Sequence, residues 1–237
     1  MDRATSDGVD RDAERYGRTW TYESIVGAVP GVDVPDGVAL AVQFALFETL
    51  VLAVAGVYGL WAAVPAATAA VVVATAGSAL MLDLGRRLRR ADLPDAYTHV
   101  VFGSSVETVL GVLAYVALCT YLFAVDPRDG TTLLGALVGP SLPAPAVFLA
   151  LLVCWDVCYR IGVGWWAAVT ALWRSVAFDL DASADAAARR ADLRVAAFGV
   201  LQLLLVPFLG RAPLLALAVG GHVVAVVGVV AVARVWR

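Results

Sequence analysis

The chain has 237 residues, of which 61% are hydrophobic and 16% are charged, with a mean hydropathy of +0.83 and a net charge of −3. The apolar residues form long runs instead of amphipathic periods, which excludes an ordinary soluble domain. No basic stripe with interleaved aromatic residues occurs, so a nucleic-acid partner is also excluded. We therefore expect an all-α integral membrane helical bundle whose first partner is the lipid bilayer.

The polar start of the chain differs from everything that follows it. Residues 1–37 are acid-rich, and the first apolar run is too long for the core of a secretory signal. We expect a cytoplasmic segment here, with a short interfacial helix over residues 18–29 that is anchored by Trp20 and Tyr22. Residues 38–237 then form a six-span membrane domain. Its predicted spans are residues 38–61, 64–84, 100–125, 145–167, 193–209 and 212–233.

The connections between these spans predict how the helices are paired. Short turns join spans 1 and 2 and spans 5 and 6, so each pair should form an antiparallel hairpin. The basic segment 85–99 reads as a loop, with Asp83 pairing with Arg86 and Arg87 at the membrane surface. The apolar centre of segment 126–143 is too short to cross a bilayer and predicts an interfacial or re-entrant piece. Segment 179–192 is polar and alanine-rich, and predicts an exposed helix.

Arginine alone gives the orientation, because the chain contains no lysine. With six spans, fourteen of the seventeen basic residues fall on the side of the two chain ends and two on the other side, while Arg160 lies within span 4. The positive-inside rule therefore predicts a cell-membrane protein with both termini in the cytoplasm.

Span 4 on its own is marginal or unfavourable in lipid. It carries Asp156 and Arg160, and two charges near the centre of a membrane helix cost about 5–7 kcal/mol. Its nine Leu, Ile, Val and Phe residues return only about 3–5 kcal/mol. The span therefore needs neighbouring helices that shield both charges, which lie one turn apart on one helix face.

Candidate partners for Arg160 follow from depth, taken as about 1.5 Å per residue from the cytoplasmic face. Glu107 on span 3 lies at about the same depth as Arg160, whereas Glu48, Asp156 and His222 lie deeper. We expect these five residues to form one buried polar cluster. Ionisable residues inside a membrane are functional candidates by default, although such a cluster also serves simply to fix helix register.

Other side chains have simpler interpretations. His222 lies among small residues and reads as a packed histidine. Trp165, Trp166 and Trp173 fit an interfacial aromatic belt. The three cysteines fall within spans and lack zinc-type spacing, so neither a metal nor another cofactor is expected.

Two functions of different classes remain open. The buried polar cluster fits translocation of an ion, a proton or a small solute, although no pair of broken helices in matching halves supports a carrier. The alternative is a non-catalytic membrane scaffold or accessory subunit, whose charges hold the bundle together while its cytoplasmic segments meet a membrane or cytoplasmic protein partner. An enzyme is not expected, because no catalytic motif is found.

Two segments carry a family resemblance: WDVCYRIGVGWW followed by LWRS in span 4, and YESIVGAVPG before span 1. They resemble an uncharacterised family of multi-pass membrane proteins of haloarchaeal type. The halophilic composition agrees with this resemblance, with sixteen Asp against four Glu and arginine as the only strong base. The resemblance implies a membrane location and no particular activity.

Overall fold

A computed structural model describes Trp20 and residues 34–129, 132–139 and 143–236 of the chain. Most of the described residues are helical, and none of them lies in a strand. The helices are α2 (Asp36–Tyr58), α3 (Val64–Arg90), α4 (Asp95–Gly103), α5 (Val106–Thr120), α6 (Leu133–Val138), α7 (Ala144–Ala177), α8 (Ala182–Leu201) and α9 (Pro213–Val235). Shorter helical turns are η1 (Trp61–Ala63), η2 (Tyr121–Val125), η3 (Asp126–Asp129) and η4 (Gln202–Leu209). The predicted interfacial helix over residues 18–29 lies outside the described residues, Trp20 excepted.

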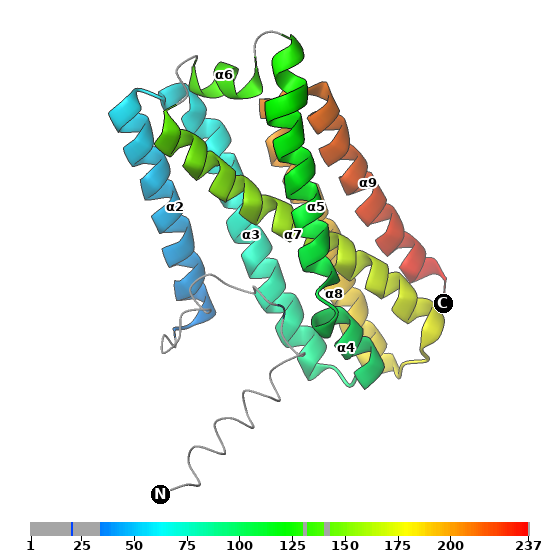
Figure 1. Cartoon of the computed structure of the whole chain (residues 1–237). Helices are drawn as coiled ribbons and strands as arrows, with labels where there is room; N and C mark the ends of the chain where they lie inside the picture. The colour runs from blue at the N-terminus through cyan, green and yellow to red at the C-terminus, as the bar shows by residue number, and fades with distance from the viewer. Residues whose placement is uncertain (1–19, 21–33, 130–131, 140–142, 237) are drawn as a thin grey trace, which may run out of the picture.

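Six helical segments are long and apolar enough to cross a membrane, which confirms the predicted all-α, six-span fold. They are Asp36–Tyr58, Trp61–Arg90, Asp95–Val125, Ala144–Ala177, Ala182–Leu209 and Pro213–Val235. Successive segments run in opposite directions (Figure 1). We call the end where α2 begins and α9 ends the basal end, and the opposite end, which carries α6, the distal end.

Helix α7 organises the bundle. It crosses the other helices obliquely and is in contact with α2, α3, α4, α5, α8 and α9 (Figure 1). In the most apolar stretch of α7, 56% of the residues are buried inside the bundle, against 11% for the Asp95–Val125 segment and 17% for the Pro213–Val235 segment. The most deeply buried helix is therefore the one that carries two charges in its middle.

Close contact between α5 and α7 depends on glycine. A Cβ atom added to Gly162 would lie 2.7 Å from the Gly111 nitrogen and 2.8 Å from the Glu107 carbonyl oxygen. The two backbones therefore touch, as small residues allow at membrane helix crossings. The crossing fixes which face of α7 is turned toward α5.

The helices extend beyond the apolar spans at the basal end. Helix α3 runs on to Arg90, and α8 begins at Ala182, within the segment predicted to be exposed. The exposed prediction is wrong for one side of this segment, because Ala184, Ala188 and Ala191 are buried. Their three- and four-residue spacing places the alanines on one face, which packs against neighbouring helices.

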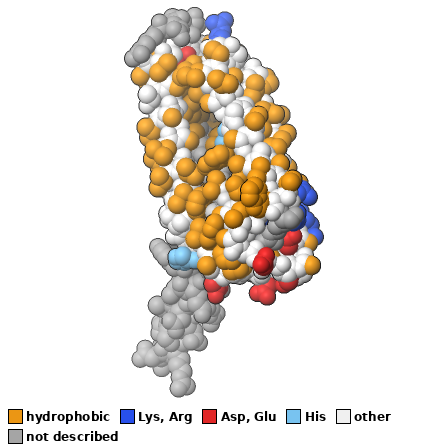
Figure 2. All heavy atoms as spheres, turned by 90° about the vertical axis from the view of Figure 1, so that its right-hand side faces the viewer, with side chains coloured by type: hydrophobic (Ala, Val, Ile, Leu, Met, Phe, Trp, Pro, Cys, Tyr) orange, Lys and Arg blue, Asp and Glu red, His pale blue; other side chains and the backbone are white. Residues whose placement is uncertain are grey.

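The outer surface fits a lipid environment. Large apolar side chains that point outward include Leu113, Phe148, Leu217 and Val224, each more than half exposed. Figure 2 shows apolar side chains covering one side of the bundle, with most acidic and basic side chains gathered near its basal end. Helical structure also satisfies the backbone hydrogen bonds internally, as the hydrocarbon region requires.

Candidate functional site

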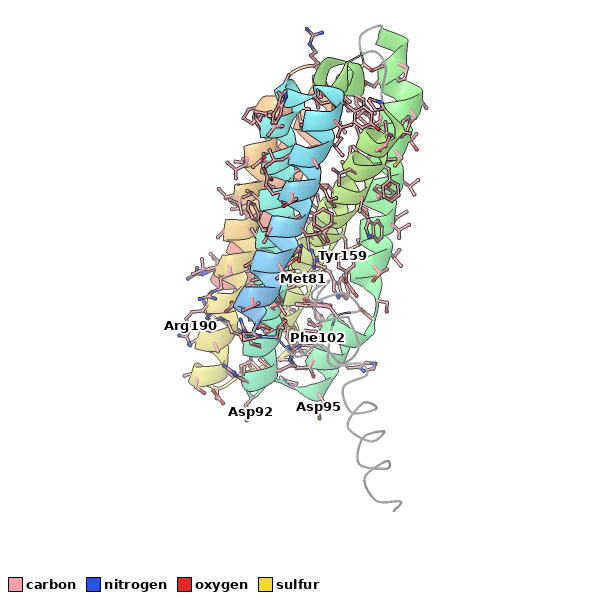
Figure 3. The ribbon with its side chains drawn as sticks, turned by 90° about the vertical axis from the view of Figure 1, so that its left-hand side faces the viewer. Met81, Asp92, Asp95, Phe102, Tyr159 and Arg190 are labelled. Atoms are coloured by element: carbon pink, nitrogen blue, oxygen red, sulfur yellow. The ribbon has the colours of Figure 1, made fainter. Side chains whose placement is uncertain are left out.

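An ion pair lies in the middle of the bundle on α7. Arg160 Nη2 donates to Asp156 Oδ1 at 2.9 Å, and the two side chains are 0% and 5% exposed. Both residues belong to one helix and are four positions apart, so the pair closes within a single turn. The guanidinium also packs against the sulfur of Met81 and over the ring of Tyr159, at 5.4 Å from its centroid. Met81 and Tyr159 lie well inside the bundle, above the basal residues Asp92, Asp95 and Arg190 (Figure 3).

Neutral side chains connect this ion pair to the neighbouring helices. The Gln43 amide on α2 donates to Ser78 Oγ at 3.0 Å, and the Ser78 hydroxyl returns a bond to Gln43 Oε1 at 3.1 Å. The same amide lies 3.5 Å from Asp156 Oδ2. All three side chains are buried. We call Gln43, Ser78, Asp156 and Arg160 the central network; it joins α2, α3 and α7.

Gly77 makes room for the arginine. A Cβ atom at this position would lie 2.6 Å from Arg160 Cγ and 2.7 Å from Arg160 Cβ. The stem of Arg160 therefore lies directly on the α3 backbone. Sequence reasoning missed Gln43, Ser78 and Gly77 because none of these residues carries a charge; the signal that could have found them is the amide side chain of Gln43 inside an apolar span.

Glu107 does not form the ion pair with Arg160 that depth predicts; no such pair is present among the described residues. Gly162 faces the Glu107 carbonyl across the α5–α7 crossing, whereas Arg160 faces Gly77 on α3. Two residues along a helix are separated by about 200° of rotation. Glu107 and Arg160 are predicted at equal depth, but this rotation places the two charges on opposite sides of α7. Glu107 is fully buried, with its carboxyl Oε1 3.4 Å from the hydroxyl of Thr108.

The remaining two candidates, Glu48 and His222, lie apart from Arg160, from Glu107 and from each other. Glu48 on α2 is half-buried and accepts a hydrogen bond from the hydroxyl of Thr68 on α3 at 2.7 Å. His222 on α9 is also half-buried and lies beside Trp165 of α7, with ring centroids 6.1 Å apart. The structure thus brings together Asp156 and Arg160, and places Glu48, Glu107 and His222 elsewhere.

A second buried charge network lies near the basal end. Arg174 Nη2 donates to Asp192 Oδ2 at 2.6 Å, and Arg174 Nη1 donates to the Tyr97 hydroxyl at 3.0 Å. Their exposed fractions are 2–4%. We call Tyr97, Arg174 and Asp192 the basal network; it joins α4, α7 and α8. Sequence reasoning missed it, because these residues lie beyond the apolar spans, in segments that read as a loop or as exposed helix.

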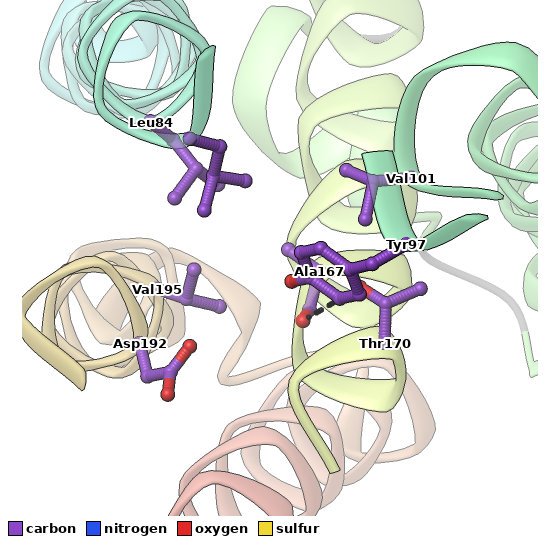
Figure 4. A pocket seen from close by; sticks show the side chains of 8 residues that line it. Leu84, Tyr97, Val101, Ala167, Thr170, Asp192 and Val195 are labelled. Carbon is purple, nitrogen blue, oxygen red and sulfur yellow. Dashed lines mark hydrogen bonds between the residues drawn. The ribbon is translucent and has the colours of Figure 1, made fainter. Parts of the chain in front are cut away.

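A small cavity adjoins the basal network. Its volume is about 10 Å³, and Figure 4 shows Tyr97, Thr170 and Asp192 lining it together with apolar side chains from α3, α4, α7 and α8. The Thr170 hydroxyl donates to the Ala167 carbonyl at 3.1 Å. The space is that of about one water molecule, so no solute fits there.

Trp20 is buried in the bundle, whereas the sequence predicts that it anchors a helix at the membrane interface. It is 3% exposed, and its indole N–H donates to the Val101 carbonyl at 3.0 Å. A continuous helix would pair that carbonyl with the nitrogen of Ser105, but Ser105 has φ 53° and ends the α4 pattern. Trp20 thus satisfies an acceptor that the break between α4 and α5 leaves open.

The three tryptophans predicted to form the aromatic belt lie at different levels of burial. Trp165 and Trp166 are half-buried, and Trp173 is 37% exposed. The ring of Trp173 lies beside Tyr97 of the basal network, with centroids 6.2 Å apart.

Within the described part of the chain, no group of three or more His, Cys, Asp or Glu residues could hold a metal ion. The three cysteines are not joined in disulfides.

Fold and site together define a six-span helical membrane protein with charged networks sealed inside it. The family model described as a family of unknown function (DUF7530) matches residues 15–233, so the chain belongs to this uncharacterised family. Neither the comparison with curated proteins nor the comparison with solved structures finds a match.

Proposed function

We propose that this protein is a non-catalytic membrane scaffold or accessory subunit whose buried charges hold the helix bundle together. The observation that carries the proposal is the neutralisation of Arg160 inside the chain. Its charge meets Asp156 at 2.9 Å in a place where the two residues are 1% and 4% exposed. An arginine whose charge is neutralised within the bundle in this way needs no bound solute to be stable.

The dimensions of the interior support the same proposal. The cavity beside the central network has a volume of about 10 Å³. Small-molecule sites are typically about 300–1,000 Å³, so a solute carrier would need a large opening of the bundle. A scaffold needs no such movement.

Location and orientation form part of the proposal. We place the protein in the cell membrane with its basal end in the cytoplasm, because Arg86, Arg89, Arg90 and Arg190 are exposed there. Arg211 lies at the distal end. The extended basal helices then offer a cytoplasmic partner a polar surface. A source among salt-loving archaea fits the lysine-free composition.

Removing the charges one at a time and together tests the structural role. Arg160→Met or Asp156→Leu alone leaves one buried charge without its partner, and should reduce the yield of folded, monodisperse protein severely. The double variant removes both charges and should recover most of that yield, as a well-packed apolar replacement of a buried pair does. Folded single variants that have lost only a transport activity would contradict the scaffold.

One observation favours a second candidate, a proton relay. Gln43, Thr75 and Asp156 line the small central cavity, and Glu48 lies on the same α2–α3 interface. A space of this size admits water but no larger solute. Proton flux into vesicles that contain the purified protein, measured with a pH-sensitive dye, tests this candidate. A relay predicts flux that Asp156→Asn and Glu48→Gln abolish, and the scaffold predicts no flux.

A further inference from the structure

The small cavity between α2, α3 and α7 has a mixed lining. Its apolar walls are Phe47, Val71, Ala74 and Val153, and its polar walls are Gln43, Thr75 and Asp156. Its volume of about 10 Å³ is close to the smallest space that holds one water molecule. Purely apolar cavities of proteins stay dry, whereas cavities with two to four polar groups hold water.

The polar groups that line the cavity can form further hydrogen bonds. Asp156 Oδ1 accepts from Arg160, but the contact that Oδ2 makes with the Gln43 amide is long, at 3.5 Å. Thr75 Oγ1 is buried and has no hydrogen-bond partner among the residues that the structure describes. A carboxylate oxygen accepts more than one hydrogen bond, and a hydroxyl both donates and accepts. Buried polar atoms are rarely left without a partner.

We propose that the cavity holds one water molecule that bridges Thr75 Oγ1 and Asp156 Oδ2. The water donates one hydrogen to the carboxylate and accepts the hydrogen of the threonine hydroxyl. Its remaining hydrogen is available to Gln43 Oε1, an amide oxygen that accepts more than one hydrogen bond. The bridge extends the central network by one more side chain of α3, and it applies whether the protein is a scaffold or a relay.

Charge decides between water and a cation at this position. The oxygen atoms of Asp156, Gln43 and Thr75 are of the kind that a sodium ion prefers. Asp156 is, however, already paired with the guanidinium of Arg160 at 2.9 Å. A second positive charge there would meet an arginine instead of a bare carboxylate, and like charges repel strongly in a low dielectric. A neutral ligand is therefore favoured.

The variant Thr75→Val tests the bridge by the sign of its effect. Valine has the shape of threonine but lacks the hydroxyl. If the water is present, the variant removes one of its partners, and the thermal midpoint of the detergent-solubilised protein should fall by about 2–4 °C. If the cavity is dry, the hydroxyl of Thr75 is an unsatisfied buried group, and the variant should leave the midpoint unchanged or raise it. That result would overturn the proposal.

Two controls make the test specific. Thr49→Val makes the same chemical change on the exposed side of α2 and should not lower the midpoint. Thr75→Ser keeps the hydroxyl and should retain the water. An experimental density map that resolves ordered waters should show a peak within hydrogen-bond distance of both Thr75 Oγ1 and Asp156 Oδ2. An empty map, or a midpoint that rises with sodium but not with potassium, would overturn the assignment to water.

Discussion

The central and the basal network each bury an arginine and an aspartate, but they join the helices in different ways. The Arg160–Asp156 pair lies within α7, four residues apart. The Arg174–Asp192 pair bridges α7 and α8, and Tyr97 adds α4. An ion pair within one helix lowers the cost of placing that helix in lipid, and it reaches neighbouring helices only through the other contacts of its two side chains. In the central network the neutral residues Gln43 and Ser78 make the connection instead.

The largest loss of stability is expected at the basal network, because its ion pair joins two helices. Asp192→Leu leaves Arg174 buried without its carboxylate and should lower the free energy of unfolding by about 3–5 kcal/mol. The measurement is thermal or denaturant unfolding of the protein in detergent.

The double variant Arg174→Met with Asp192→Leu should regain most of this loss, because it removes both charges. If Asp192→Leu alone unfolds as the original protein does, the basal pair does not hold α7 to α8.

Gly77 tests how tightly the central network is packed. The substitution Gly77→Val forces a side chain into the stem of Arg160 and against Phe198, whose Cζ would lie 2.9 Å from the new Cβ. Overpacking of this kind costs about 1–3 kcal/mol.

Gly164→Ala is the matched control on α7, since its nearest neighbour, Phe198, would lie at 3.8 Å, an ordinary contact distance. Equal unfolding curves for Gly77→Val and Gly164→Ala would mean that the arginine stem has room to move.

Trp20 is not part of the basal network but should stabilise it through a neighbouring contact. Its indole binds the carbonyl of Val101, a residue that lines the basal cavity beside Tyr97. Trp20→Phe keeps an aromatic ring against Phe102 but removes the hydrogen bond, and should cost about 0.5–1.5 kcal/mol.

Trp236→Phe makes the same replacement at a 68% exposed position and should leave the unfolding curve unchanged. A similar result for Trp20→Phe would show that ring packing alone fixes Trp20.

The smallest effect concerns Asp181, the residue that caps the helix carrying Asp192. Its carboxylate accepts hydrogen bonds from the backbone nitrogens of Ala184 and Ser183 and from the Ser183 hydroxyl, which lowers its pKa below the usual 3.8. Because the folded-state pKa is depressed, the stabilisation is complete above the unfolded-state pKa and is lost as the pH falls through the folded-state value. Amide exchange of the first turn of α8 should therefore speed up below about pH 4 beyond the intrinsic rate.

Asp181→Ala should show that faster exchange already at neutral pH, whereas Asp181→Asn should retain much of the protection without the pH dependence. A first turn whose protection is the same at pH 3 and pH 7 in the original protein would contradict the cap.

The residues selected from the sequence show that depth in the membrane alone does not identify the partner of a buried charge. Counting residues from the membrane face places Glu107 level with Arg160, but it ignores the direction in which each side chain leaves its helix. Asp156 was identifiable because a spacing of four fixes both depth and direction. The basal network was not identifiable, since Arg174 and Asp192 follow the apolar run and resemble ordinary surface charges. Gln43, Ser78 and Gly77 carry no charge and give no distinct pattern.

The sequence by itself determined that this chain is a six-span helical membrane protein, because hydropathy depends on each segment alone. It also determined that Asp156 and Arg160 need shielding. Only the tertiary structure decided which residues provide it, through the oblique path of α7 and the glycine contacts at Gly77 and Gly162. Those contacts depend on the rotation of each helix about its own axis, and side chains from distant segments fix that rotation jointly.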